Sequence, residues 1–202
     1  MTRSIRVAAV VAAAFTLGAC ADLTTGPELA LSGSDTVLER PDAAAEAQQA
    51  PAPGAESIAE IAIGAGFSEL VGALVYVDAK LDAGLVDLFL NGTDQFTVFA
   101  PTNEAFEGLY EFQEIDGITD LAPELVLDVL LYHVAEGRRA ANSVVPRNGT
   151  RTITTLLGAT FSVNTSAQIN DIFGQTANIV APNISASNGI IHVIDTVILP
   201  LD

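Results

Sequence analysis

The spacing of apolar residues changes along this chain of 202 residues, and the change limits the folds open to it. Before Phe96, apolar residues such as Phe67, Leu70 and Leu74 recur every three or four positions, which predicts helices. After Gly137 the apolar residues instead gather in short runs that are typical of strands, at 152–157, 160–163, 178–180 and 189–199. Helices followed by strands predict a single α+β domain, because no internal repeat divides the chain further.

A short strand and a helix are predicted where the two patterns meet. Phe96–Ala100 is an apolar run that Pro101 stops, and Thr102 or Asn103 then offers a side-chain oxygen to cap a helix. A second helix is predicted to begin with Pro123 at its first position and to end near Tyr132-His133. Its inward residues are predicted to be Leu125, Val129 and Leu130.

The first residues have the pattern of an export signal. Arg3 and Arg6 precede an apolar run, and Leu17-Gly-Ala-Cys20 resembles the bacterial lipobox, in which the signal is cut before a cysteine that then carries lipid. The alternative is an ordinary secretory signal with a chance cysteine. The predicted organisation is a signal at 1–19, a lipidated, disordered acidic Ala/Pro-rich tether at 20–55, and a domain at 56–202.

Lipid on Cys20 would hold the protein on a membrane while its whole polypeptide stays in water. Because Ala21 follows Cys20, the outer membrane is the expected location if the host is Gram-negative. Cys20 is also the sole cysteine of the sequence, which excludes a disulfide framework for the exported domain.

The formal charge of −17 excludes nucleic acid as a partner, because such binding requires basic residues. The charge is unevenly spread. Arg138, Arg139, Arg147 and Arg151 lie in a stretch without acids, and two interpretations remain open. They form a cationic spot for phosphate or carboxylate groups of envelope glycans, or they solubilise an exposed strand edge.

No enzymatic motif is present in the sequence, and no cofactor or metal is predicted. The two histidines are the natural candidates for catalysis. The alternation of the last strand places His192 and Asp195 on opposite faces, so they cannot form an acid-base pair within it. We therefore expect a buried, hydrogen-bonded His192 and an Asp195 that binds backbone amides.

Three segments together carry a resemblance to a known family. They are Thr97-Val-Phe-Ala-Pro-Thr-Asn-Glu-Ala-Phe106, Tyr132-His133, and Asn188-Gly-Ile-Ile-His-Val-Ile-Asp-Thr-Val-Ile-Leu-Pro200. In this order they resemble a fasciclin-like domain spanning roughly residues 57–201. The resemblance implies helices packed on a mostly antiparallel β-sheet wedge that includes the first strand. It makes Pro101, Thr102, Asn103, Gly189, His192 and Asp195 structural residues of the motif.

The same resemblance implies adhesion or partner binding without a shared catalytic centre. In animal members a Tyr-His element has been linked to integrin binding, which makes Tyr132 and His133 candidate contacts. The alternative is that they lock a helix end onto the sheet. An Asp-Ile pair is a second adhesive element in some members, but here Asn183-Ile184 stands in its place and lacks the charge.

The sequence thus predicts a non-catalytic binding module, anchored in the cell envelope, whose partner is a surface protein or a polysaccharide. The alternative is a carrier of an apolar small molecule such as a carotenoid, as some fasciclin-like proteins are. That alternative rests on the 50% hydrophobic composition and on apolar helices before Phe96 that could line a groove.

Overall fold

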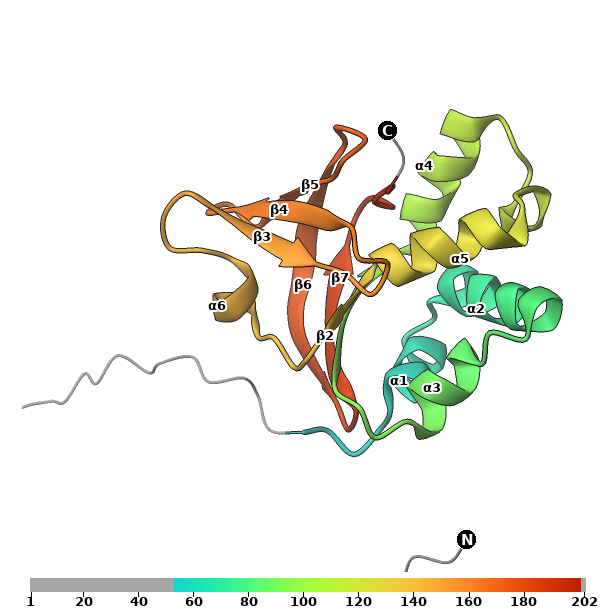
Figure 1. Cartoon of the computed structure of the whole chain (residues 1–202), viewed down its shortest axis with the longest axis horizontal. Coiled ribbons are helices and arrows are strands. Elements are labelled where there is room, and N and C mark those ends of the chain that lie inside the picture. Colours follow the sequence, from blue (N-terminus) through green and yellow to red (C-terminus); the bar gives the residue numbers. More distant parts are fainter. Residues whose placement is uncertain (1–52, 201–202) are drawn as a thin grey trace, which may run out of the picture. The chain divides into compact units, whose positions relative to one another are not determined.

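Helices and strands occupy largely separate stretches of residues 53–200, the part of the chain that the computed structural model describes (Figure 1). The helices are α1 (Ile58–Gly64), α2 (Ser68–Leu81), α3 (Leu85–Asn91), α4 (Asn103–Gln113), α5 (Pro123–Tyr132) and α6 (Ala141–Val144), with a 3-10 turn, η1 (Ile118–Asp120). The strands are β1 (Phe96–Pro101), β2 (Val134–Glu136), β3 (Thr150–Thr154), β4 (Thr160–Asn164), β5 (Gln168–Asn170), β6 (Thr176–Ala186) and β7 (Gly189–Ile194). The predicted signal, Cys20 and nearly all of the predicted tether lie outside the described residues.

Seven strands form one mixed sheet in the order β2-β1-β7-β6-β5-β4-β3. Strand β1 runs parallel to β7, with Phe96 opposite Gly189, and every other neighbouring pair is antiparallel. The first strand therefore joins the later strands, and the sheet is mostly antiparallel, as expected. All six residues of β1 and all six of β7 are buried, because both strands lie inside the sheet and are covered on both faces.

Strand β6 connects the two halves of the sheet. Its first residues, 176–178, pair with β5, and the rest, 179–186, pairs with β7. Two register shifts interrupt the pairing with β7, between Ile179 and Ala181 and between Ala181 and Ile184. Such irregularities bend a strand and increase its twist, which lets one strand serve both halves.

Two hydrophobic cores result, one on each face of β1 and β7. Val98 and Ile191 point into a core shared with helices α1 to α5, whereas Phe99 and Ile194 point into a core shared with β3 to β6. Figure 1 shows helices α1 to α5 on one side of β1 and β7, and strands β3 to β5 together with α6 on the other. This alternation follows from the two-residue repeat of a strand.

Several boundaries differ from the sequence-based prediction. The short elements β2, β5 and α6 were not predicted, because three or four residues leave too little periodicity. The last strand ends at Ile194 rather than Leu199, although Val197 to Leu199 remain buried after strand pairing has stopped. In α5, which begins at Pro123 as predicted, Val126 is buried and Leu125 only partly so.

Candidate functional site

The Tyr132-His133 pair is buried at the end of α5. Tyr132 has no exposed surface, and its hydroxyl donates to the carbonyl oxygen of Thr160 at 3.0 Å. His133 Nδ1 lies 2.7 Å from the carbonyl oxygen of Val129 and therefore donates to it, while Nε2 accepts the amide of Ile198 at 3.2 Å. Burial lowers the pKa of His133 to about 4. The neutral pair locks the helix end onto the sheet, which corrects the hypothesis that its side chains contact a partner directly.

Asn183 occupies an irregular part of β6 with a positive φ of 65°, a conformation that asparagine tolerates better than most residues. Its side-chain oxygen accepts the amide of Ala141 at 2.8 Å, and its own amide donates to His192 Nδ1 at 3.2 Å. The neighbouring Ile184 packs against the helical core. Asn183 and Ile184 are therefore part of the sheet, and the side-chain oxygen of Asn183 already accepts a hydrogen bond within the domain.

His192 is also fully buried and engaged at both ring nitrogens. Besides the bond to Asn183, its Nε2 donates to the carbonyl oxygen of Arg139 at 2.9 Å. Burial lowers the pKa of His192, although the bond to Arg139 opposes the shift. Neither histidine of the domain therefore offers a free nitrogen for proton transfer.

Asp195 bonds to β6 instead of to His192. Its two carboxylate oxygens accept the backbone amide of Asn178 at 2.7 Å and the side-chain amide of the same residue at 2.8 Å. Partial burial works to raise the pKa of Asp195, but these hydrogen bonds outweigh it and hold the pKa below its usual value. The expectation that Asp195 binds a backbone amide is confirmed.

The turn from β1 to α4 makes contacts with α4, α2 and β7. Thr102 is the residue that caps α4, since its hydroxyl accepts the amide of Ala105 at 3.2 Å. Asn103 reaches to α2 instead, where its side chain accepts the amide of Glu69 and donates to the carbonyl oxygen of Gly66. Pro101 pairs with the end of β7, and these residues are thus structural.

The four arginines differ in their surroundings. The guanidinium of Arg138 is partly buried and donates to the carbonyl oxygens of Ala186 and Gly189, at the turn between β6 and β7. Arg139 and Arg151 bond to backbone carbonyls near their own segment, and Arg147 is exposed. Arg138 therefore has a structural role, since it ties its own segment to the β6–β7 turn. Neither interpretation of the sequence anticipated this role. Of the four arginines, Arg139, Arg147 and Arg151 remain candidates for contact with a partner.

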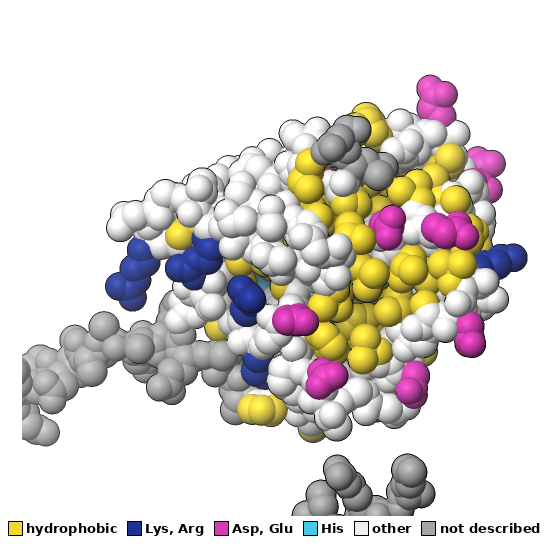
Figure 2. Space-filling model, viewed as in Figure 1, with side chains coloured by type: hydrophobic (Ala, Val, Ile, Leu, Met, Phe, Trp, Pro, Cys, Tyr) yellow, Lys and Arg dark blue, Asp and Glu magenta, His cyan; other side chains and the backbone are white. Residues whose placement is uncertain are grey.

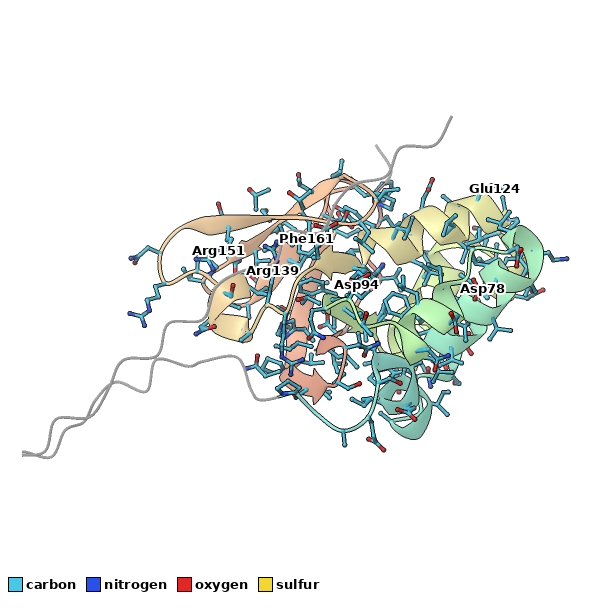
Figure 3. All side chains as sticks on the ribbon, turned by 60° about the horizontal axis from the view of Figure 1, so that its bottom comes forward. Asp78, Asp94, Glu124, Arg139, Arg151 and Phe161 are labelled. Atoms are coloured by element: carbon cyan, nitrogen blue, oxygen red, sulfur yellow. The ribbon has the colours of Figure 1, made fainter. Side chains whose placement is uncertain are left out.

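Charge is segregated on the surface. On the face shown in Figure 2, most Lys and Arg side chains gather over the β3, β4 and α6 region, and Asp and Glu side chains surround the helices. Figure 3 shows the same division, with Arg139 and Arg151 on the strand side and Asp78 and Glu124 on the helical side. Arg151 lies on β3, which is an edge strand of the sheet.

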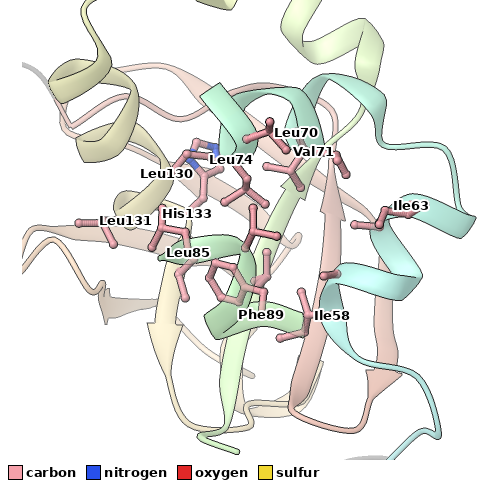
Figure 4. Close-up of a pocket in the computed structure, with 16 residues that line it drawn as sticks. Ile58, Ile63, Leu70, Val71, Leu74, Leu85, Phe89, Leu130, Leu131 and His133 are labelled. Carbon is pink, nitrogen blue, oxygen red and sulfur yellow. The ribbon is translucent and has the colours of Figure 1, made fainter. Parts of the chain in front are cut away.

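An apolar cavity of about 130 Å³ opens between the helices. Figure 4 shows Ile58 and Ile63 of α1, Leu70, Val71 and Leu74 of α2, Leu85 and Phe89 of α3, and Leu130 and Leu131 of α5 around it. His133 also lines it, but both ring nitrogens are already bonded. The cavity therefore offers no free polar group, and a groove among these helices was anticipated from their apolar sequence.

A second hollow, of about 360 Å³, lies between α4, the turn that joins β5 to β6, and the segment after β7. We call it the aromatic groove. Its lining is Glu104, Ala105, Gly108, Leu109, Phe112, Phe173, Gln175, Asp195, Thr196 and Val197. No sequence pattern indicated this groove, because three segments far apart along the chain contribute its walls.

Neither a metal cluster nor a membrane-spanning helix occurs within residues 53–200. No group of three or more His, Cys, Asp or Glu side chains is arranged to hold a metal ion in that part of the chain. In the same range, no helix combines the length and apolar character that crossing a membrane requires.

The chain is similar to several bacterial proteins. It is 34% identical over 167 residues to Protein sll1483 of Synechocystis sp., covering 81% of this chain and 84% of that one. It is 38% identical over 116 residues to Immunogenic protein MPB70, and 35% identical over 119 residues to Cell surface glycolipoprotein MPB83, both of Mycobacterium bovis. These two matches cover 57% and 59% of this chain and 54% and 49% of the relatives, so the chain spans about half the length of each mycobacterial protein.

A solved domain pair of the insect cell adhesion molecule Fasciclin I matches with a TM-score of 0.45 and 18% identity, over 64% of this chain and 45% of that one. The family model described as Fasciclin domain matches residues 65–200. That range contains all seven strands, the helices α2 to α6 and each of the three segments that carry the resemblance. The chain belongs to the fasciclin domain family.

Proposed function

We propose that this protein is an exported, non-catalytic binding module of the cell envelope that mediates adhesion by contacting a surface protein or a polysaccharide. The observation that carries the proposal is its membership of a family in which a similar bacterial protein is named a cell surface glycolipoprotein. The Leu17–Cys20 segment supports the same location, since lipid on Cys20 would anchor the chain.

The state of the two histidines supports a function without catalysis. General acid-base catalysis requires a group within hydrogen-bond reach of the substrate proton. His133 and His192 are both buried, and both nitrogens of each ring already have partners in the domain. Their positions favour roles in holding the fold.

A deletion strain of the source organism tests the adhesion proposal. We expect it to lose attachment or cell aggregation, and the wild-type gene to restore them. A gene with Cys20→Ala behind a secretory signal of the non-lipoprotein type should export the domain without an anchor and fail to restore them. Normal attachment and aggregation in the deletion strain would contradict the proposal, and the mass of the amino-terminal peptide tests acylation independently.

The apolar cavity favours a second candidate, a carrier of an apolar small molecule such as a carotenoid. Its volume of about 130 Å³ is close to that of an engineered cavity of about 150 Å³ that binds benzene. It takes one ring or a short hydrocarbon segment, so a carotenoid would extend beyond it. Protein purified from its own host and extracted with organic solvent should then yield a stoichiometric apolar ligand, and a ligand-free extract rejects this function.

A further inference from the structure

Two phenylalanine side chains that line the aromatic groove are exposed and lie against each other. Phe112, near the end of α4, is 59% exposed, and Phe173, in the turn after β5, is 41% exposed. Their ring centroids are 6.0 Å apart and their planes cross at 81°, an edge-to-face arrangement. Large apolar side chains that gather on a surface beside a hollow mark an interaction site.

The size of the groove matches a small-molecule or polymer subsite. Its volume of about 360 Å³ lies within the roughly 300–1,000 Å³ of ligand sites in proteins. Leu109 and Val197, both buried, contribute apolar surface, while Glu104, Gln175 and Thr196 contribute polar groups. A ligand with an apolar face and a polar edge fits this division.

The polar groups of the groove define the ligand chemistry. Among the described residues, neither the carboxylate of Glu104 nor the side-chain amide of Gln175 has a hydrogen-bond partner. Glu104 only accepts hydrogen bonds when ionised, whereas the amide of Gln175 both donates and accepts them. Hydroxyl groups, which also donate and accept, match this pair. An ammonium or guanidinium group only donates, and would leave the amide hydrogens of Gln175 unmatched.

The charge of the groove excludes anionic ligands. Glu104 and Asp195 both line it, and no Lys, Arg or His of the described residues does. Phosphate, sulfate or uronate groups would meet two carboxylates with no cation to pair with them. The groove therefore disfavours anions, and the amide of Gln175 beside the carboxylate of Glu104 favours an uncharged ligand that is rich in hydroxyl groups.

We propose that the aromatic groove binds a neutral polysaccharide. The C–H face of a sugar ring stacks on one of the two phenylalanine rings and its edge contacts the other, while its hydroxyls bond to Glu104 and Gln175. The proposal rests on the proposed adhesive function and narrows its partner from any surface protein or polysaccharide to an uncharged glycan. An open groove suits a polymer, because the chain can continue beyond the site.

The test is binding of the full-length protein to defined oligosaccharides, measured by isothermal titration. Cellohexaose and laminarihexaose are the neutral probes, an alginate oligomer is the anionic probe, and a lysine-rich peptide is the cationic one. We expect binding of a neutral probe and none of alginate. Phe112→Ala and Phe173→Ala should each weaken it about tenfold or more, because each removes one of the two aromatic rings that contact the sugar.

Two further variants sharpen the result. Glu104→Gln should weaken binding of the neutral probe, and it should still not bind alginate. Leu90→Ala, a matched control at an exposed apolar residue of α3 outside the groove, should leave the affinity unchanged. Both phenylalanines are largely exposed, so their replacement by alanine should preserve the fold, which thermal unfolding checks.

Three outcomes overturn the inference. They are no binding of either neutral probe, equal binding in the wild-type and both phenylalanine variants, and binding of the cationic peptide alone. The deletion strain separates this failure from failure of the proposed function. If both phenylalanine variants restore attachment fully, adhesion stands and the aromatic groove is not its binding site.

Discussion

His133 is a residue whose protonation opposes folding. Burial lowers its pKa to about 4, whereas a histidine in the unfolded chain has a pKa near 6.5. The unfolded state therefore binds a proton at a higher pH than the folded state. The contribution of neutral His133 to stability is complete above about pH 6.5 and is lost as the pH falls toward 4, to a total of about 3 kcal/mol.

Urea unfolding measured between pH 7.5 and pH 4 checks this expectation. In His133→Gln the free energy of unfolding should be lower at pH 7.5 but should fall less steeply between pH 6.5 and pH 4. Every other ionisable group, including buried His192, is the same in both proteins, so the difference in slope isolates His133. Equal slopes in the two proteins would contradict the prediction, and an NMR titration of the His133 ring measures its pKa directly.

Arg138 stabilises the turn between β6 and β7 through its guanidinium. Arg138→Met keeps much of the length of the side chain but removes the donors to the carbonyl oxygens of Ala186 and Gly189. Loss of hydrogen bonds from a charged, partly buried donor costs about 1.5–3 kcal/mol, which chemical denaturation should detect. Arg147→Met, at an exposed arginine of the same stretch, should change stability by less than about 0.5 kcal/mol. Similar losses in the two variants would argue against a specific role of Arg138.

At the scale of the elements, the close approach of β1 and β7 depends on Gly189. A Cβ atom at this position would lie 2.2 Å from the carbonyl oxygen of Phe96 and 2.8 Å from Ile58 Cδ1. The strands would have to separate inside the sheet, so Gly189→Ala should cost more than about 3 kcal/mol in a thermal or urea melt.

Gly72→Ala is the matched control for this prediction. Gly72 is an exposed residue inside α2, and a Cβ atom added there would meet no tertiary neighbour within 4 Å. Alanine there should raise the free energy of unfolding by up to about 1 kcal/mol, because it favours the helix. A mild effect of Gly189→Ala, comparable in size to that of Gly72→Ala, would show that the parallel pair of β1 and β7 tolerates a side chain at position 189.

For the whole molecule, the dominant electrostatic property is negative charge on the helical side. Residues 53–136 carry 16 acids and a single lysine, whereas residues 137–200 carry four arginines and two acids. Salt screens repulsion among exposed like charges, so the domain should become more stable as sodium chloride rises from about 0.01 M to 0.5 M. An increase of about 1 kcal/mol would raise the Tm by roughly 4 °C.

Calorimetry at pH 7.5 measures this rise. At about pH 4 many carboxylates are protonated, so the same addition of salt should have a smaller effect. A Tm that stays constant or falls with salt at pH 7.5 would mean that attractive ion pairs outweigh repulsion in the domain.

Much of the fold could be predicted from the sequence. The α+β class, β1, the start of α5 at Pro123 and the burial of His192 all follow from local spacing or from capping and turn residues. Family membership could be predicted as well, because its three segments are continuous stretches of sequence. Short elements such as β2 and β5 could not, because partners distant in sequence determine their pairing.

Some features of the candidate binding sites could likewise be predicted from the sequence, and others could not. The sequence by itself determined the uneven distribution of charge along the chain and the apolar character of the helices that line the cavity, because these properties depend on the order and type of residues alone. Only the tertiary structure decided that Tyr132 and His133 are buried, that Arg138 ties its own segment to the β6–β7 turn, and that Phe112 meets Phe173. The physical reason is that burial, hydrogen-bond partners and surface grooves arise from contacts between distant segments, which local patterns do not specify.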